Sequence, residues 1–261
     1  MKKKLQILNK SFNEPISCLT AYSAPIAKIL DGIVDIVLIG DSLGTTLYGM
    51  KNSQKVTLDM MKYHGLAVSQ NVKKSITVID MPYKTYNTKD EAFKNAKALL
   101  KFTKVKLLKL EINEKNLSII KFLSSKNINV IAHIGVTPQS FKDFKKIKVV
   151  GKTNSESKRL IELALNAERL GAKAILLECV TKETAKKIST VCKLPTIGIG
   201  ASKYCDGQVL VFDDLIKMDS TQHMPKFVKN YLNFNNLAKK AVVKFSKDVK
   251  QKKFPSKQFT Y

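Results

Sequence analysis

Short apolar runs that end in a polar residue recur along this chain. The clearest lies in VDIVLIGDSLG at 34–44, where four apolar residues and a glycine precede Asp41 and Ser42. Later runs of the same form end, in chain order, at Asp80, Glu111, His133 and Glu178. An unbroken apolar run of this length is typical of a parallel strand that is buried on both faces. Since parallel strands of a barrel end at one rim, these runs predict a polar site there.

Segments with helical spacing of apolar residues separate the runs. Three further apolar runs, at 16–20, 196–200 and 208–212, bring the predicted strands to eight. Helices are predicted at 23–30, 57–68, 89–100, 114–123, 155–170 and 181–191. This alternation over 261 residues predicts an α/β fold of the (β/α)8 TIM barrel type, in a single domain spanning 1–261. A doubly wound open sheet is the alternative, but the first turn has no GxGxxG motif and the chain has no P-loop.

Two long loops and a tail interrupt the alternation. The loop at 40–55 is rich in Gly, Thr and Ser, and its length favours a functional role. The loop at 135–151 contains KDFKKIK at 142–148, for which we expect a solvated loop rather than a lid or an oligomer contact. From about 225 to 261 the chain is lysine-rich and amphipathic, and a helical tail that packs on the barrel or on a neighbouring subunit is predicted.

The chain carries a net charge of +25, which brings nucleic acid and anionic membranes into consideration as partners. Of its 46 basic residues, only Arg159 and Arg169 are arginines, and the lysines are scattered along the sequence. Because arginine is favoured for bidentate recognition of phosphates and bases, we expect no nucleic-acid partner. No apolar run approaches the roughly 18 residues of a membrane span, and no membrane partner is expected.

The four cysteines form no CxxC motif and no closely spaced pair, which favours a reduced cytoplasmic protein. The basic start of the chain lacks the apolar segment of a signal peptide, because Asn9 and Lys10 interrupt it. We therefore expect cytoplasmic localisation.

Asp41 and Asp80 end neighbouring predicted strands, so their carboxylates are expected within reach of one cation. Hard oxygen ligands of this number suit Mg²⁺, which keeps waters and takes substrate oxygens as its remaining ligands. Either aspartate alone would more often be a helix N-cap or an Asx-turn. The pair, with Glu111 on the next strand, favours a metal site. With only three histidines in the chain, a zinc site built from several imidazoles is not expected.

Lys109 lies two residues before Glu111 and is predicted to point to the same side of its strand. A lysine buried among carboxylates suits a substrate carboxylate, and a structural salt bridge with Glu111 is the alternative. His133 is either a hydrogen-bonding partner for a substrate oxygen or a core histidine. For His64, on the apolar face of a predicted helix, a structural role is favoured.

Glu178 follows the apolar run Ala-Ile-Leu-Leu, and desolvation there would make its carboxylate a stronger base. A cation, an anion-binding lysine and a basic carboxylate at one rim predict deprotonation next to a carbonyl. The resulting enolate would be stabilised by the cation.

Ten ordered segments give the sequence a resemblance to a known family. They include CLTAYSAP at 18–25, IGDSLG at 39–44, IDMPY at 79–83, LKLE at 108–111, HIGVTPQS at 133–140 and LPTIGIGA at 194–201. Together they resemble the ketopantoate hydroxymethyltransferases over nearly the whole chain. The resemblance implies a (β/α)8 barrel, usually a homodecamer, in pantothenate biosynthesis. Such enzymes transfer a hydroxymethyl group from 5,10-methylenetetrahydrofolate to 3-methyl-2-oxobutanoate, giving 2-dehydropantoate.

Carried over residue by residue, the resemblance assigns a role to each strand-end group. It makes Asp41 and Asp80 the Mg²⁺ ligands that also face the substrate, with Glu111 reaching the metal directly or through water. Ser42, Lys109 and His133 would hold the oxo acid, and Glu178 would be the base. The chain departs from the family at Ile112-Asn113 and at Ser202, where glycines are frequent, so a tighter rim or a shifted folate side is expected.

Two other functions are compatible with parts of the sequence. The first is another Mg²⁺-dependent barrel of the isocitrate lyase and phosphoenolpyruvate mutase kind, which shares strand-end acids and enolate chemistry. Its reactive Lys-Cys-His-like loop is not evident here, and dependence on methylenetetrahydrofolate separates the two functions. The second is a nucleic-acid-binding protein, for which only the charge argues.

Overall fold

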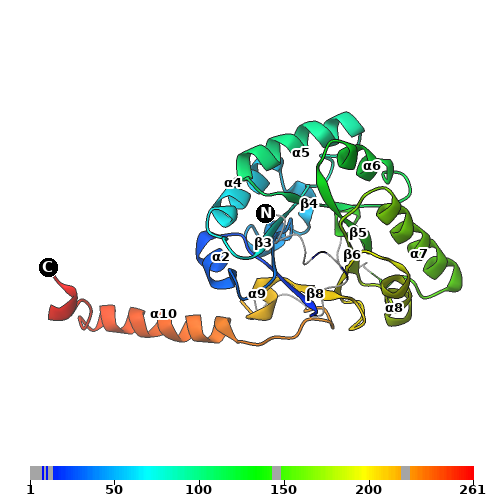
Figure 1. The fold of residues 1–261 in the computed structure, drawn as a ribbon. Coiled ribbons are helices and arrows are strands. Elements are labelled where there is room, and N and C mark those ends of the chain that lie inside the picture. The colour runs from blue at the N-terminus through cyan, green and yellow to red at the C-terminus, as the bar shows by residue number, and fades with distance from the viewer. Residues whose placement is uncertain (1–7, 9, 11–13, 143–147, 219–223) are drawn as a thin grey trace. The chain divides into compact units, whose positions relative to one another are not determined.

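The computed structural model describes Leu8, Lys10 and residues 14–142, 148–218 and 224–261. Eight parallel strands close into a barrel in the order β1 to β8, and helices surround it (Figure 1). The strands are β1 Ile16–Thr20, β2 Ile36–Ile39, β3 Ile76–Asp80, β4 Leu107–Glu111, β5 Asn129–Gly135, β6 Ala174–Glu178, β7 Thr196–Ile199 and β8 Gly207–Leu210. The predicted (β/α)8 fold is confirmed, and pairing of β1 with β8 excludes the open sheet.

Helices follow most strands. Those of the barrel unit are α2 Ala24–Leu30, α3 Leu43–Thr46, η2 Ser53–Lys55, α4 Leu58–Ser69, α5 Lys89–Thr103, α6 Ser118–Ser125, η3 Pro138–Ser140, α7 Asn154–Arg169 and α8 Lys182–Val191. Threonine N-caps begin three of them, because the side chains of Thr57, Thr88 and Thr153 accept hydrogen bonds from backbone N–H groups three residues on. Each such cap contributes about 1 kcal/mol. Gly171, with φ +100°, follows α7 where a left-handed residue is needed.

Two predicted segments differ from the structure, and a third is not tested by it. The loop predicted at 40–55 contains the short helices α3 and η2. Helix α6 begins at Ser118 rather than at residue 114, because Asn113 and Asn116 bond to nearby backbone N–H groups and form a turn instead. Of the lysine-rich segment at 142–148, residues 143–147 lie outside the described residues.

The chain divides into two compact units, Met1–Val211 and Phe212–Tyr261. The second unit contains α9 Phe212–Leu215, α10 Phe234–Lys250 and η5 Lys257–Phe259. The tail predicted as helical from about 225 is helical only from Phe234, where Asn233 caps α10 by accepting from the Asn236 N–H. That barrel and tail form a single domain stays a prediction.

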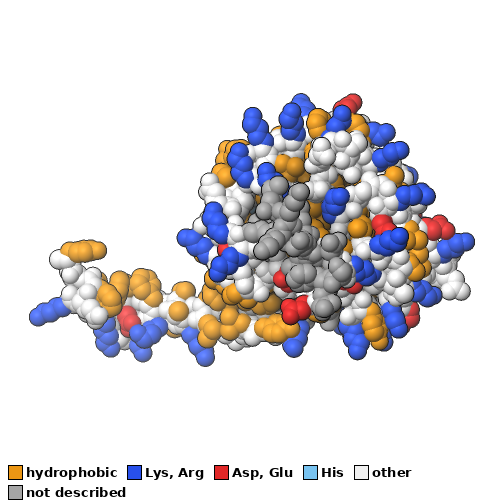
Figure 2. Space-filling model, in the orientation of Figure 1, with side chains coloured by type: hydrophobic (Ala, Val, Ile, Leu, Met, Phe, Trp, Pro, Cys, Tyr) orange, Lys and Arg blue, Asp and Glu red, His pale blue; other side chains and the backbone are white. Residues whose placement is uncertain are grey.

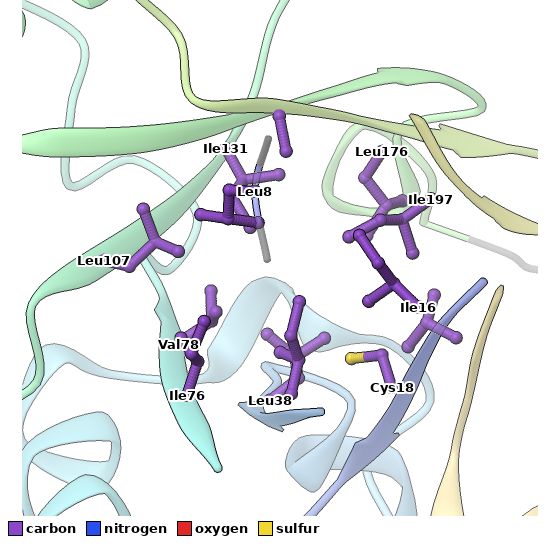
Figure 3. Packing of buried hydrophobic residues seen from close by; sticks show 13 residues of the cluster. Leu8, Ile16, Cys18, Leu38, Ile76, Val78, Leu107, Ile131, Leu176 and Ile197 are labelled. Atoms are coloured by element: carbon purple, nitrogen blue, oxygen red, sulfur yellow. The ribbon is translucent and has the colours of Figure 1, made fainter. Parts of the chain in front are cut away.

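The barrel interior is apolar towards the amino-terminal ends of the strands. Figure 3 shows side chains from successive strands converging there. The cluster comprises Leu8, Ile16, Cys18, Ile36, Leu38, Ile76, Val78, Leu107, Ile131, Ala174, Leu176, Ile197 and Val209. On most strands the first and third residues point inward, so the next inward position is the fifth.

Lysine and arginine side chains are spread over the visible surface rather than gathered in one patch (Figure 2). Among the described residues, no helix is both long enough and apolar enough to cross a membrane.

Candidate active site

The strand-end residues predicted from the sequence meet at the carboxyl-terminal rim of the barrel. Asp41 and Ser42 follow β2 after Gly40, and the others lie on β3 to β6, at Asp80, Lys109, Glu111, His133 and Glu178. The register sets Asp80 beside Lys109, Glu111 beside His133 and Glu178 beside Gly135. Most of these groups are deeply buried, and the side chain of Glu178 keeps 19% of its surface exposed. The sequence therefore located one continuous group of polar residues.

Lys109 forms its ion pair across strands. Its Nζ lies 3.1 Å from Asp80 Oδ1, so the structural salt bridge that we considered with Glu111 is formed with Asp80 instead. Burial acts to lower the pKa of Lys109, but the surrounding carboxylates, led by Asp80, outweigh burial and raise it. Lys109 is therefore a permanent positive charge at the rim.

His133 joins Lys109 to Glu178. Its Nδ1 lies 3.4 Å from Lys109 Nζ, and its Nε2 lies 3.2 Å from Glu178 Oε2, although the angle at the second contact is unfavourable. Burial, together with the charge of Lys109, lowers the pKa of His133, so the ring is neutral at pH 7. Because an ammonium group can only donate, Nδ1 accepts and Nε2 carries the hydrogen that faces Glu178.

Carboxylates outnumber cations at the rim. Burial raises the pKa of Asp80 to about 7, with Lys109 lowering it and Asp41 raising it further. Burial also raises the pKa of Glu111 well above its usual value, and Asp41 contributes in the same direction. Four carboxyl groups, of Asp41, Asp80, Glu111 and Glu178, thus face one lysine and a neutral histidine. An added cation would stabilise the charged forms of these carboxyl groups, so the site favours one.

The donor groups suit a magnesium ion, which binds water and substrate as well as protein. They suit less well a metal whose ligands all come from the protein. Within the described residues, no three His, Cys, Asp or Glu side chains are grouped as a ready metal site. Asp41 and Asp80 are nevertheless adjacent, since the backbone N–H of Asp41 donates to Asp80 Oδ2 at 3.0 Å. Asp80 Oδ1 is buried and has no hydrogen bond of good geometry in the described part of the chain. Two carboxylates suit Mg²⁺, which keeps several waters and takes substrate oxygens.

Several residues around the rim were missed as site residues. Tyr22 is buried after β1, and its hydroxyl lies 2.7 Å from Ser42 Oγ. His64, for which a structural role was expected, has its Nδ1 2.6 Å from the backbone oxygen of Tyr22. Gln139 is buried after β5 and bonds to both Asp41 and Glu111. Tyr22 and Gln139 lie inside the segments CLTAYSAP and HIGVTPQS, which was the only signal that the sequence offered for them.

The two departures from the family lie in ordered turns. Ile112 is buried, and its backbone N–H donates to His133 O at 2.8 Å. Ser202 is also buried, and its hydroxyl accepts from the Tyr204 N–H at 3.2 Å. Neither turn removes a polar group from the rim, and their effect on folate binding stays a prediction.

Comparison with solved structures confirms the fold. A phosphonopyruvate hydrolase in complex with oxalate and Mg²⁺ matches with a TM-score of 0.58 at 11% identity, over 98% of this chain and 93% of the other. Oxaloacetate acetylhydrolase matches with a TM-score of 0.61 at 14% identity, over 81% of this chain and 80% of the other.

Sequence comparison identifies the family. The ketopantoate hydroxymethyltransferase family model matches residues 2–257. The 3-methyl-2-oxobutanoate hydroxymethyltransferase of Pelagibacter ubique is 45% identical and covers 100% of this chain and 99% of its own length. The enzyme of the same name from Anaplasma marginale is 41% identical, over 98% of this chain and 92% of its own length. The chain therefore belongs to the ketopantoate hydroxymethyltransferase family of transferases.

Proposed function

We propose that this enzyme transfers a hydroxymethyl group from 5,10-methylenetetrahydrofolate to 3-methyl-2-oxobutanoate, giving 2-dehydropantoate and tetrahydrofolate. The observation that carries the proposal is the convergence of Lys109, His133, Glu178 and the aspartate pair at one rim, in a chain of this family. The net reaction consumes one water, forms a C–C bond at C3 of the oxo acid, and releases the one-carbon unit from the folate nitrogens.

The basic groups at the rim suit the carboxylate of the oxo acid. Lys109 stays protonated and can donate to a substrate oxygen while it remains paired with Asp80. Neutral His133 can exchange its contact with Lys109 or Glu178 for one with a substrate oxygen. Ser42 offers a hydroxyl next to Asp41. These groups would orient the substrate with its C3 hydrogen towards Glu178.

Glu178 is proposed as the base that takes the C3 proton. Its carboxylate is the most accessible of the four acidic groups, and its contact with His133 holds one oxygen at the rim. Mg²⁺, held by Asp41 and Asp80 with Glu111 directly or through water, would supply positive charge beside the carbonyl oxygen as negative charge develops there. That charge would make the C3 hydrogen more acidic, which favours its transfer to the carboxylate.

The family membership also supports a proposal about the location and assembly of the enzyme. We propose a cytoplasmic homodecamer whose partners are small molecules and not nucleic acid or membranes. The cysteines Cys18, Cys179, Cys192 and Cys205 are all free and buried, which fits a reducing compartment. The molar mass of the assembly, measured by light scattering, tests the homodecamer.

The function is tested with the purified full-length chain, 3-methyl-2-oxobutanoate, Mg²⁺ and methylenetetrahydrofolate. We expect 2-dehydropantoate only when all are present, and loss of product when a chelator removes the metal. Without folate, the enzyme should still exchange the C3 hydrogen with deuterated water. Cleavage of a 2-oxo acid or its derivative without folate would instead favour the isocitrate lyase and phosphoenolpyruvate mutase kind of chemistry.

A further inference from the structure

Gln139 bonds to two of the rim carboxylates. It lies in η3, in the loop that follows β5, the strand that carries His133, and 3% of its surface is exposed. Its backbone N–H donates to Glu111 Oε1 at 3.1 Å, and its side-chain Nε2 donates to Asp41 Oδ2 at 2.8 Å. One residue thus fixes an oxygen of each carboxylate, although Asp41 follows β2 and Glu111 ends β4.

The surrounding groups allow the amide of Gln139 only one orientation. Nε2 uses both of its hydrogens, on Asp41 and on the backbone oxygen of Met81 at 3.0 Å. Oε1 accepts from the hydroxyl of Tyr86 at 2.6 Å. Burial, with the charges of Glu111 and Asp41, raises the pKa of Tyr86 well above its usual value, so the hydroxyl keeps its proton and donates. A reversed amide would set an oxygen against two acceptors.

The same residue connects two loops. Gln54, in η2 after β2, donates from its Nε2 to the backbone oxygen of Gln139 at 2.8 Å. Asn52 donates to the backbone oxygen of Lys142 at 2.9 Å in the same manner. Strands β2 and β5 are separated by β3 and β4 in the barrel, so these bonds tie together loops that leave different parts of the rim. Gln139 is therefore held from its backbone as well as from its side chain.

We infer that Gln139 is a positioning residue that holds Asp41 and Glu111 oriented to receive a divalent cation. The inference rests on the proposed metal site. An amide is suited to this task because a glutamate here would bring a further carboxylate against Asp41, and an apolar residue would leave Asp41 Oδ2 without its donor. Loss of a residue that orients metal ligands typically lowers metal affinity or activity by about 10- to 100-fold.

The test measures binding of Mn²⁺, as a probe for the divalent ion, to the full-length chain by electron paramagnetic resonance of the free ion. Gln139→Met keeps the volume and the backbone N–H but removes the amide. We expect its dissociation constant for Mn²⁺ to rise by about 10- to 100-fold. Gln70→Met, the same change at an exposed residue that ends α4, is the matched control and should bind as the wild type does.

Activity at high Mg²⁺ separates positioning from damage to the fold. If Gln139 acts on the cation site, saturating Mg²⁺ should restore kcat in Gln139→Met while the Mg²⁺ concentration for half-maximal rate stays raised. Partial unfolding would lower kcat at every Mg²⁺ concentration. Tyr86→Phe should weaken Mn²⁺ binding in the wild type but add nothing in Gln139→Met, because Tyr86 acts through the amide.

Two results would overturn the inference in distinguishable ways. If the wild type binds Mn²⁺ and Asp80→Ala does not, yet Gln139→Met stays within about threefold of the wild type, the metal site stands and the role of Gln139 is wrong. If the wild type binds no Mn²⁺, or Asp80→Ala binds it equally well, the proposed metal site fails and the inference fails with it.

Discussion

The two halves of the barrel interior come from the same strands but differ in chemistry. On β3 the inward residues run from Ile76 through Val78 to Asp80, and on β4 from Leu107 through Lys109 to Glu111. The early positions join an apolar cluster, whereas the later ones carry buried charge. Since side chains alternate with a period of two, one strand supplies both halves without a change in its backbone.

The polar half of the interior carries the proposed chemistry, whereas the apolar half supplies the stability. The raised pKa of Asp80, about 7, means that the folded chain binds the Asp80 proton more tightly than the unfolded chain does. At neutral pH, burial of the charged form therefore opposes folding in the absence of a cation. The apolar half must offset this cost, so substitutions in the two halves should change different measured quantities.

The largest effect is expected for Glu178→Gln in the polar half. Glutamine keeps the size of the side chain but removes the base, so hydroxymethyl transfer and C3 hydrogen exchange should fall by about 10²- to 10⁴-fold. Exchange is followed in deuterated water by nuclear magnetic resonance. Glu183→Gln, an exposed residue of α8, is the control and should leave the rate unchanged. Wild-type exchange in Glu178→Gln would rule this residue out and move the search to His133.

A comparable free-energy change, but in stability, is expected for Ile76→Ala in the apolar half. The side chain is buried in the cluster, and its truncation leaves a cavity that should cost about 2–5 kcal/mol of unfolding free energy. Denaturant unfolding measures the loss, and kcat of the folded fraction should stay near the wild-type value. Ile29→Ala, at a side chain with 55% of its surface exposed, is the control. A large drop in kcat for Ile76→Ala would show that the two halves are not separable.

Metal binding should stabilise the polar half independently of the apolar half. Mg²⁺ at about 100 times its dissociation constant adds about 2.7 kcal/mol to the unfolding free energy if it binds only the folded chain. Ile76 and Asp80 are four residues apart, about 13 Å along the strand, so the increment should be the same in Ile76→Ala. Denaturant unfolding with Mg²⁺ and with chelator measures the increment. Asp80→Asn should lose the increment, and an equal increment there would contradict the assignment of Asp80.

The sequence predicted the strands well because each is a short apolar run whose burial on two faces leaves a strong signal. The run at 36–39 coincides with β2, and the acids that follow the runs reached the rim as expected. Pairing of Lys109 was less predictable. Residues two apart on a strand, such as Lys109 and Glu111, lie about 6.6 Å apart. Neighbouring strands lie only about 4.8 Å apart, so Asp80 on β3 is closer to Lys109 than Glu111 is.

The contacts of Gln139 could not be predicted in this way. They join the loop after β5 to the loop after β2, which includes Asp41, and to Glu111 on β4, and such contacts depend on tertiary structure that no local pattern encodes. The start of α6 was also mispredicted, since the asparagine side chains that delay it compete with helical hydrogen bonds only in that turn.

The smallest effect is expected at Cys18, where the two halves meet. Its side chain belongs to the apolar cluster, yet burial and, to a lesser extent, the charge of Asp80 raise the pKa of its thiol. A thiol that stays protonated is no nucleophile, so Cys18 should act only as a small apolar group. Cys18→Ala should therefore cost about 1 kcal/mol of unfolding free energy and leave kcat unchanged. Denaturant unfolding and steady-state kinetics measure the two quantities. A fall in kcat with little change in stability would mean that the thiol takes part in the chemistry, and the boundary between the two halves would then lie deeper in the barrel.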